Sequence, residues 1–288
     1  IQQLKQEFEW RYDHPGEPIY APLLLKQLSD KMKPNTIVTT DVGQHQMWSA
    51  QHIAVDGPEN FLTSSGLGTM GFGIPAAVGA QVARPEDTVV CVSGDGSFMM
   101  NVQELGTIKR KQLPVKILLL DNQRLGMVRQ WQQLFHDKRY SFVNITSPDF
   151  VAVAKGYYID GNKICERKDL KDALKTMLDH DGSYLLEVMV GKENNVFPMV
   201  AQGTSVSEIR LKKIIMDSKQ EYTITLYTEN SIGILGRVAG IFTRRKINIE
   251  SLSTSPSEIE NVHRFTIVIE ESEEVVRKLC MQIEKQID

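Results

Sequence analysis

Short runs of continuous apolar residues alternate with segments of helical periodicity from Ile19 to about Leu186. The apolar runs are expected to be strands: TIVTTDVG, TVVCVSGDG, VKILLLDN and SYLLEVMV. The segments expected to be helices are YAPLLLKQLSDKM, IPAAVGAQVAR, VQELGTIKRK, MVRQWQQLF and DLKDALKTMLD. A strand that is apolar at every position must be covered on both faces, and helical connections make successive strands parallel. The pattern therefore predicts a doubly wound α/β domain over residues 19–200, preceded by a polar linker over residues 1–18.

The pattern changes after Pro198. Residues 201–220 are polar, contain no clean strand and are expected to be a linker. The segments that follow, in residues 221–288, are EYTITLYTE, ILGRVAGIFTRRK, NIESLSTSPS, NVHRFTIVIE and SEEVVRKLCMQIEKQID. Their β-α-β-β-α order fits a smaller ferredoxin-like α+β unit without its last strand, which leaves an open sheet edge. Because the chain starts at Ile1 and stops inside an expected helix, we expect both ends to be truncated.

Composition excludes several classes of function. The 288 residues are 41% hydrophobic and 24% charged, as in a folded globular protein, and the formal net charge of -3 gives no basic field for nucleic acid. The apolar runs are too short to cross a bilayer, so no membrane partner is expected. The three cysteines are scattered and form neither a metal spacing nor a disulfide framework. A reducing, cytoplasmic location is therefore expected.

Asp95 lies between two glycines at the end of an expected strand, and Asn122 ends the next expected strand, after residues 97–121. In open parallel sheets ligands bind at the carboxyl ends of the strands, so these two side chains should share one edge. An Asp carboxylate and an Asn carbonyl suit a small divalent cation whose other ligands are waters and phosphate oxygens. Gly96 lets the backbone approach closely, and Ser97 can face a phosphate. The pattern predicts a metal that holds a diphosphate.

Two other interpretations of these glycine-rich stretches are open. Gly-Asp-Gly could be a simple turn in which Asp95 caps the next helix, although the matching donor at Asn122 favours the metal site. GLGTMGFG also contains the GxGxxG dinucleotide fingerprint. We reject a nicotinamide site there, because the preceding NFLTSS is not an apolar strand and the next acids, Glu86 and Asp87, come before the following strand.

GDG followed at this distance by DNQRLGMV resembles the cofactor-binding motif of the thiamine-diphosphate-dependent enzymes. The stretches DVGQHQMW, SSGLGTMGFGIPAA, GDGSFMMNVQEL, LDNQRLGMVRQWQ and VFPMV narrow the resemblance to the catalytic subunit of the acetohydroxyacid (acetolactate) synthase family. This resemblance covers residues from about 10 to 211.

The resemblance implies magnesium bound by Asp95, Asn122 and the main-chain carbonyl of Arg124. Family members often have Asn-Asn where this chain has Asp121-Asn122, and the ligand itself is retained. The residues implied to bind thiamine diphosphate are Gln44, His45, Gly68, Met70, Gly94, Gly96, Ser97, Asn122, Gly126 and Met127.

On the catalytic side, the resemblance implies that Met70 supports the bent cofactor, and that Met127 and Trp131 line the place where a second 2-keto acid enters. By residue type alone the two methionines could be ordinary core residues. Trp131 could be a core residue of an amphipathic helix, and His45 a hydrogen-bonded loop residue.

The second domain resembles an ACT domain, specifically that of the small regulatory subunit of the same family, through TENSIGILGRVAGIFTRRKINIESL and HRFTIVIE. The resemblance implies a branched-chain amino-acid effector, usually valine, at an interface between two copies. The residues expected to bind it are Asn230, Gly233, Ile234, Leu235 and Asn248. Alternatively, this unit only docks on and stabilises the catalytic part. Because a regulatory chain could start at Met216, a gene fusion is a reasonable hypothesis.

The resemblance implies decarboxylation of pyruvate and transfer of the product to a second pyruvate or to 2-ketobutyrate. It also implies a homo-oligomer whose active site uses a glutamate from an N-terminal domain that this chain lacks, and FAD bound largely outside this segment. The chain alone is therefore expected to bind cofactor poorly and to be inactive. Two alternatives stay open: another thiamine-dependent enzyme, such as a pyruvate oxidase, glyoxylate carboligase or decarboxylase, and a non-catalytic regulatory protein.

Overall fold

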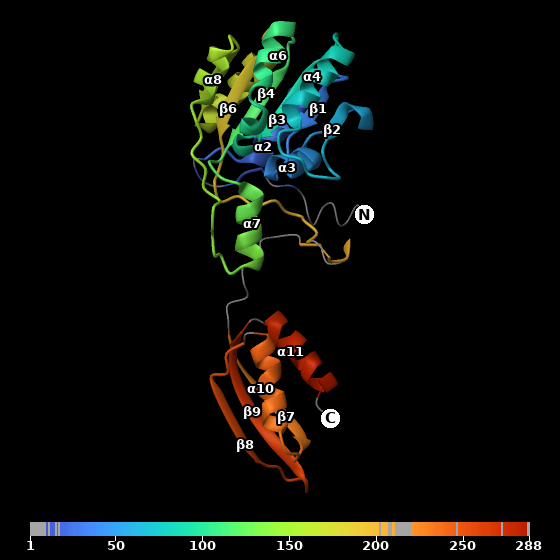
Figure 1. The fold of residues 1–288 in the computed structure, drawn as a ribbon, viewed down its shortest axis with the longest axis vertical. Coiled ribbons are helices and arrows are strands. Elements are labelled where there is room, and N and C mark those ends of the chain that lie inside the picture. The colour runs from blue at the N-terminus through green and yellow to red at the C-terminus, as the bar shows by residue number, and fades with distance from the viewer. Residues whose placement is uncertain are drawn as a thin grey trace. The chain divides into compact units, whose positions relative to one another are not determined.

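The computed structural model describes residues 10–286 except residues 11, 15, 17, 202, 207, 208, 211–219, 246 and 272. It divides the chain into two compact units, Ile1–Val196 and Phe197–Asp288 (Figure 1). Most of the expected linker over residues 201–220, including Met216, lies outside the described residues, as do residues 1–9 of the N-terminal linker.

The larger unit is built on one parallel sheet of six strands in the order β2-β1-β3-β4-β6-β5. The strands are β1 (Ile37–Thr40), β2 (Phe61–Thr63), β3 (Val89–Gly94), β4 (Lys116–Asp121), β5 (Asp160–Ile164) and β6 (Tyr184–Met189). The sequence-based prediction of a doubly wound α/β domain is confirmed. The four strands expected from their apolar runs are the four inner strands of the sheet.

The two edge strands, β2 and β5, were not expected. NFLTSS, which we did not expect to be an apolar strand, contains β2, a strand of three half-buried residues. Edge strands pair on one side only and keep exposed side chains, and most of the DGNKI residues of β5 are exposed. Such strands lack the continuous apolar pattern of buried parallel strands.

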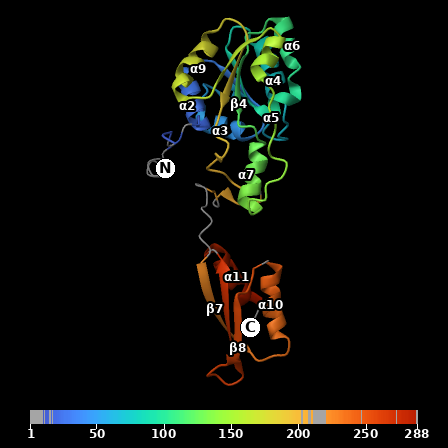
Figure 2. The ribbon, with the colours of Figure 1, turned by 90° about the vertical axis from the view of Figure 1, so that its left-hand side faces the viewer.

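Helices cover both faces of the sheet. On one face lie α2 (Ala21–Lys31), α3 (Gln44–His52) and α9 (Leu170–Asp179), and on the other α4 (Gly73–Ala83), α6 (Glu104–Lys111) and α8 (Phe150–Gly156). Figure 2 shows α2 and α9 on one side of β4 and α4 and α6 on the other. Successive side chains of a strand point to opposite faces, so Leu118 belongs to the first core and Leu119 to the second.

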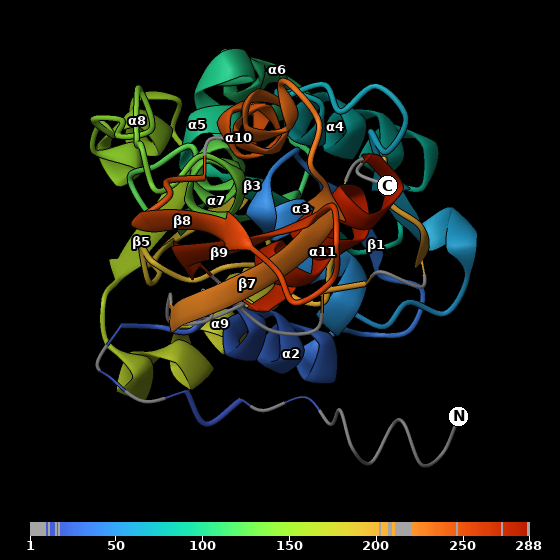
Figure 3. The same cartoon turned by 90° about the horizontal axis from the view of Figure 1, so that it is seen from below.

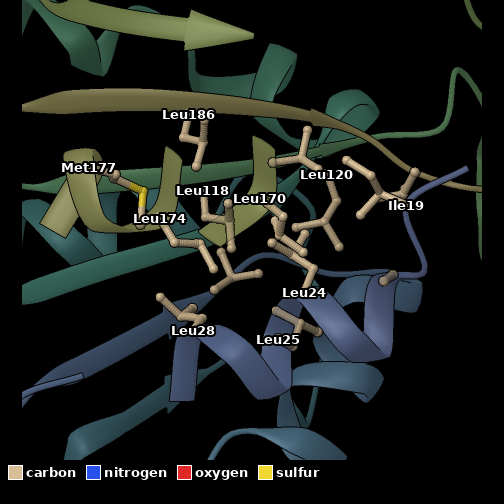
Figure 4. Close-up of a cluster of buried hydrophobic side chains, with 14 of the residues drawn as sticks. Ile19, Leu24, Leu25, Leu28, Leu118, Leu120, Leu170, Leu174, Met177 and Leu186 are labelled. Atoms are coloured by element: carbon tan, nitrogen blue, oxygen red, sulfur yellow. The ribbon is translucent and has the colours of Figure 1, made fainter. Parts of the chain in front are cut away.

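The first core contains interlocked leucines of α2, α9, β4 and β6 (Figure 4). Leu170, Leu174 and Met177 recur at the spacing of one helix face and are buried against it. The remaining elements of this unit are α5 (Asp95–Phe98), α7 (Gly126–Phe135) and the 3-10 turns η1 (Pro58–Asn60), η2 (Met99–Asn101) and η3 (Arg167–Asp169).

The described part of the N-terminal linker is packed against the larger unit. The Trp10 ring meets the His52 ring edge-on with centroids 4.5 Å apart, and the Tyr12 hydroxyl lies 3.2 Å from His52 Nδ1. Ile19 then forms a parallel bridge with Val190, directly after β6.

The smaller unit contains β7 (Gln220–Glu229), α10 (Ile234–Arg244), β8 (Ser251–Pro256), β9 (Val262–Glu271) and α11 (Glu273–Gln286). The antiparallel sheet has the order β7-β9-β8, with β9 in the middle (Figure 3). Phe265, Ile267 and Ile269 of β9 pack against the helices in a separate core. The order of elements agrees with the ferredoxin-like prediction. Among the described residues of the whole chain, no helix is long and apolar enough to cross a membrane.

Replacement of Leu118 by alanine tests the first core. Leu118 is fully buried in the central strand β4, so the substitution should lower the free energy of unfolding by about 2–5 kcal/mol. Leu67 is 94% exposed, and Leu67→Ala serves as the control. All three tryptophans, residues 10, 48 and 131, belong to the larger unit, so tryptophan fluorescence during urea titration reports its unfolding. Equal losses in both variants would contradict the proposed packing.

Candidate functional site

A cavity of about 300 Å³ opens at the carboxyl ends of the inner strands. Three segments line it: residues 42–48 after β1, residues 94–97 after β3, and residues 120–128 at the end of β4, except 121 and 123. Met70 and Val190 complete the lining. The cavity therefore joins three places that lie far apart in the sequence.

The topology of the sheet explains this location. From β1 the chain moves outward to β2, then returns to the other side of β1 with β3 and continues to β4. The helix after β1, α3, packs on one face of the sheet, while Phe98 of α5, after β3, packs on the other. At such a switch point the two connections separate, and a crevice forms between them.

The N-termini of two helices face this crevice. Gln44 and His45 form the first turn of α3, and Gly126 and Met127 that of α7. All four residues line the cavity, and neither helix has a side-chain cap at its N-terminus. The first N–H groups of a helix lack partners within the helix and favour an anion.

Asp95 is the first residue of α5 and is 3% exposed, and Asn122 is 8% exposed. Strands β3 and β4 pair with Gly94 opposite Leu120, so the residues that follow these strands emerge side by side. Burial raises the pKa of the Asp95 carboxyl, and the adjacent Asp121 carboxyl raises it further. A cation at this place would favour the ionised carboxylate that the protein alone disfavours.

The Ser147 hydroxyl lies between the two carboxyl groups, 3.4 Å from Asp95 Oδ2 and 3.4 Å from Asp121 Oδ1. Asn122 Oδ1 accepts the Arg124 N–H at 3.0 Å. Among the described residues, no group of three or more His, Cys, Asp or Glu side chains could hold a metal. The predicted site differs in kind, since it uses one carboxylate, one amide and one main-chain carbonyl.

Glycines bring the backbone close to the side chains of α3. A Cβ at Gly94 would lie 2.7 Å from His45 Nδ1, and a Cβ at Gly126 would overlap Gln44 Oε1. Any larger residue would push these side chains aside. Glycine is therefore required at both positions, because the side chains of His45 and Gln44 fill the space beside them.

His45 is buried and neutral. It is 6% exposed, its Nε2 has no hydrogen-bond partner, and burial lowers its pKa to about 3. A buried polar atom without a partner is costly, so a ligand that bonds to His45 would remove a penalty already present.

Gln44 is fixed by its own side-chain bonds. Its Nε2 donates to Gln130 Oε1 and to the Asn194 carbonyl, both at 2.9 Å. Both amide protons are used, so the group that Gln44 can offer an anion is its main-chain N–H. The Ser97 hydroxyl is likewise engaged, because it donates to the Val42 carbonyl at 2.8 Å.

The structure brings most of the predicted catalytic-domain residues together. Those that line the cavity are Gln44, His45, Met70, Gly94, Asp95, Gly96, Ser97, Asn122, Arg124, Gly126 and Met127. Two others do not line it. Gly68 lies in an exposed loop, and the Trp131 ring packs on Phe135 with centroids 4.7 Å apart.

Sequence reasoning missed the polar residues behind the cavity wall. Asp41, directly after β1, is fully buried, as are Arg129 and Gln130 on α7. Gln130 accepts the Val196 N–H at 2.8 Å and donates to the Val196 carbonyl at 3.0 Å. Only Asp41 carries a signal in the sequence, because it follows an apolar strand as Asp95 does.

In the smaller unit, Gly233 is the N-cap of α10 and has φ 87, a conformation that favours glycine. Leu235 is 48% exposed, whereas the Ile234 side chain is buried in the core, so only its main chain is available. The Asn230 N–H donates to the Asn261 carbonyl, and Asn248 Nδ2 donates to Glu250 Oε1 at 2.7 Å.

Two family models match the chain. Residues 41–188 match "Thiamine pyrophosphate enzyme, C-terminal TPP binding domain", and residues 224–288 match "AHAS small subunit-like ACT domain". The first match contains the segments that line the cavity, and the second contains most of the smaller unit.

Curated relatives are similar to the larger unit. The acetolactate synthase isozyme 2 large subunit of Escherichia coli (strain K12) is 67% identical over 208 residues, which cover 72% of this chain and 38% of that protein. The acetolactate synthase large subunit of Pyropia yezoensis is 44% identical over 230 residues, 77% of this chain and 38% of that protein. The mitochondrial acetolactate synthase catalytic subunit of Saccharomyces cerevisiae is 44% identical over 214 residues. The chain spans 31–38% of the length of these relatives.

Replacement of Gly94 by alanine tests the close packing of the wall. Because the new Cβ meets the His45 ring, the substitution should lower the free energy of unfolding by about 1–3 kcal/mol. Gly79 in α4 has open space around it, so Gly79→Ala should be neutral or stabilising by up to about 1 kcal/mol. Urea titration followed by tryptophan fluorescence measures both. Identical behaviour of the two variants would show that Gly94 is not tightly packed.

Proposed function

The chain belongs to the thiamine pyrophosphate enzymes, through their C-terminal cofactor-binding domain, and we propose that it is the diphosphate- and metal-holding part of an acetolactate synthase. The proposed catalytic domain comprises residues 19–200, and the proposed regulatory domain residues 221–288. The observation that carries the proposal is the convergence of Asp95 and Asn122 with two helix N-termini on one glycine-walled cavity.

The residues present fit the cofactor. Asp95, Asn122 and the Arg124 carbonyl offer the hard oxygen atoms that Mg²⁺ prefers. The main-chain N–H groups at the start of α3 and the unpartnered His45 Nε2 suit the diphosphate. The methionines Met70 and Met127 give the cavity an apolar side that excludes water.

Bound thiamine diphosphate supplies the carbon nucleophile and electron sink needed to decarboxylate a 2-keto acid. The proposed role of this chain is to hold the diphosphate and the metal at one end of the cavity and to present apolar side chains at the other end. We propose pyruvate as donor and pyruvate or 2-ketobutyrate as acceptor, on the names of the relatives. FAD, a homo-oligomeric assembly and a cytoplasmic location are proposed for the complete enzyme only.

For the smaller unit we propose binding of a branched-chain amino acid such as valine. The match to a regulatory-subunit ACT domain supports this assignment. The Gly233 turn supports it too, because main-chain groups at the start of α10 are suited to a carboxylate.

Replacement of Asp95 by alanine tests the metal site. Isothermal titration of the chain with thiamine diphosphate in the presence of Mg²⁺ should show weak binding that is lost without Mg²⁺. Loss of a metal ligand should weaken this binding by roughly a hundredfold. Asp149→Ala is a matched control, because Asp149 caps α8 outside the cavity. Unchanged binding by the Asp95 variant would refute the metal assignment.

Acetolactate formation from pyruvate tests whether the chain is a partial module. With thiamine diphosphate, Mg²⁺ and FAD supplied, we expect no product from the 288-residue chain, which spans 38% of its Escherichia coli relative. Acetolactate formed by the purified chain would contradict the proposal that this chain is only the diphosphate- and metal-holding part of the enzyme. An oxidase or decarboxylase product would favour another thiamine-dependent enzyme.

Valine titration tests the smaller unit. Gly233→Asp places a charged residue at a left-handed position and should abolish the heat of valine binding. Gly240→Asp introduces the same charge farther along α10 and serves as the control. Equal heats from both variants, or no heat from the unsubstituted chain, would count against an effector site at this turn.

A further inference from the structure

The loop between β2 and α4 carries Met70 into the cavity. Residues 65–69 are exposed, and Leu67 is 94% exposed. The outer half of the loop closes on itself, since the Gly68 N–H donates to the Ser64 carbonyl and the Thr69 N–H to Ser64 Oγ, both at 3.1 Å. These bonds join loop residues to each other. The position of Met70 relative to the sheet must therefore be set by other contacts.

Gly71, the next residue, is held from both sides. Its N–H donates to Asp41 Oδ1 at 2.7 Å, and its carbonyl accepts from Asn101 Nδ2 at 2.7 Å. Gly71 has φ 90, and a Cβ there would lie 2.8 Å from Asn101 Nδ2. Only glycine fits a residue held so closely in this conformation.

The first holding group, the Asp41 carboxylate, is itself immobilised. Asp41 is fully buried at the end of β1, and its Oδ1 also accepts the Val42 N–H at 3.0 Å. Its Oδ2 accepts the Ser93 hydroxyl at 3.2 Å, from β3. The Asp41 carboxylate thus joins the end of β1, the Gly71 loop and β3. Strands β1 and β3 are the two between which the winding of the sheet reverses.

The second holding group, the Asn101 side chain, belongs to the segment that contains the proposed metal ligand Asp95. Asn101 ends the 3-10 turn η2, which continues directly from α5, the turn that contains Asp95 and Ser97. The Met70 methyl group lies against this same segment, 3.8 Å from the place of a Cβ on Gly96. The Asn101 bond therefore links the position of Met70 to the position of the metal ligand.

We propose that Asp41 and Asn101 are positioning residues, which clamp the Gly71 peptide and thereby fix how far Met70 stands from the metal end of the cavity. The clamp determines the fit of the ring-bearing end of thiamine diphosphate and leaves the diphosphate end unaffected. This inference rests on the proposed function. Neither residue lines the cavity, so both act through Gly71.

Binding of two ligands of different length separates the two ends. Inorganic diphosphate with Mg²⁺ reaches the metal end only, whereas thiamine diphosphate with Mg²⁺ also meets Met70. In Asn101→Ala the affinity for thiamine diphosphate should fall roughly fivefold, the value of one hydrogen bond, with the affinity for diphosphate unchanged. Asn162→Ala, at an exposed asparagine of the edge strand β5, is the matched control. Equal loss of both ligands, or no loss, would overturn the clamp.

Two replacements of Asp41, one conservative and one not, test whether the hydrogen bond to the Gly71 N–H matters. Asp41→Asn keeps an oxygen that can accept the Gly71 N–H, so it should bind thiamine diphosphate nearly as the unsubstituted chain does. Asp41→Ala removes the acceptor and should behave as Asn101→Ala does. Equal effects of the two Asp41 variants would contradict a role through this hydrogen bond.

Amide hydrogen exchange tests the clamp without any ligand. The Gly71 N–H is protected by Asp41, so its exchange should become faster in Asn101→Ala and in Asp41→Ala, but not in Asn162→Ala. Unchanged exchange at Gly71 in both clamp variants would overturn the inference, whatever the binding result. If the unsubstituted chain binds no thiamine diphosphate while the exchange prediction is met, the proposed function and the clamp's role in cofactor fit both fail, and only the fixing of Gly71 by Asp41 and Asn101 stands.

Discussion

The reversal of winding between β1 and β3 is the constraint on which the site depends. Had the chain continued outward from β2, the connections after neighbouring strands would pack on one face and cover the strand ends. Because β3 returns to the other side of β1, the connections separate and leave the strand ends open. The helix N-termini of α3 and α7, the glycines and the proposed metal ligands Asp95 and Asn122 all lie at that opening.

The same half of the sheet contains several buried polar groups. Ser93, Asp121 and Glu187 are fully buried in the carboxyl-terminal halves of β3, β4 and β6. Burial raises the pKa of the Glu187 carboxyl, the neighbouring Asp121 carboxyl raises it further, and Lys163 pairs with Glu187 from the edge strand. Buried polar groups of this kind destabilise a fold unless they are bonded. Their position behind Asp95 is consistent with an edge shaped for binding more than for stability.

The sequence was sufficient to predict the inner strands, because full burial leaves a continuous apolar run. It was also sufficient to predict that Asp95 and Asn122 lie at one edge of the sheet, because each follows the end of such a run. The edge strands β2 and β5 were not predicted, since their pairing depends on a neighbouring backbone and leaves no continuous apolar pattern in the sequence. The contributions of Asp41 and Gln130 to the site were not predicted for a related reason. Their roles consist of contacts with Gly71 and Gln44, far away in the sequence. The sequence shows only that Asp41 follows an apolar strand, and the buried Gln130 has no local signature. The role of Trp131 came from resemblance, and its side chain contacts Phe135 instead of the cavity.

The tight packing of the cavity glycines also limits how this fold can diversify. Exchanging side chains cannot reshape the region around Gly94 and Gly126, since any added atom displaces His45 or Gln44. Side-chain replacement has more room at Met70 and Met127, which also line the cavity. Over evolutionary time, new substrate preferences in such a domain are therefore expected to arise at the two methionines, while the region around Gly94 and Gly126 stays fixed because it has no room for another side chain.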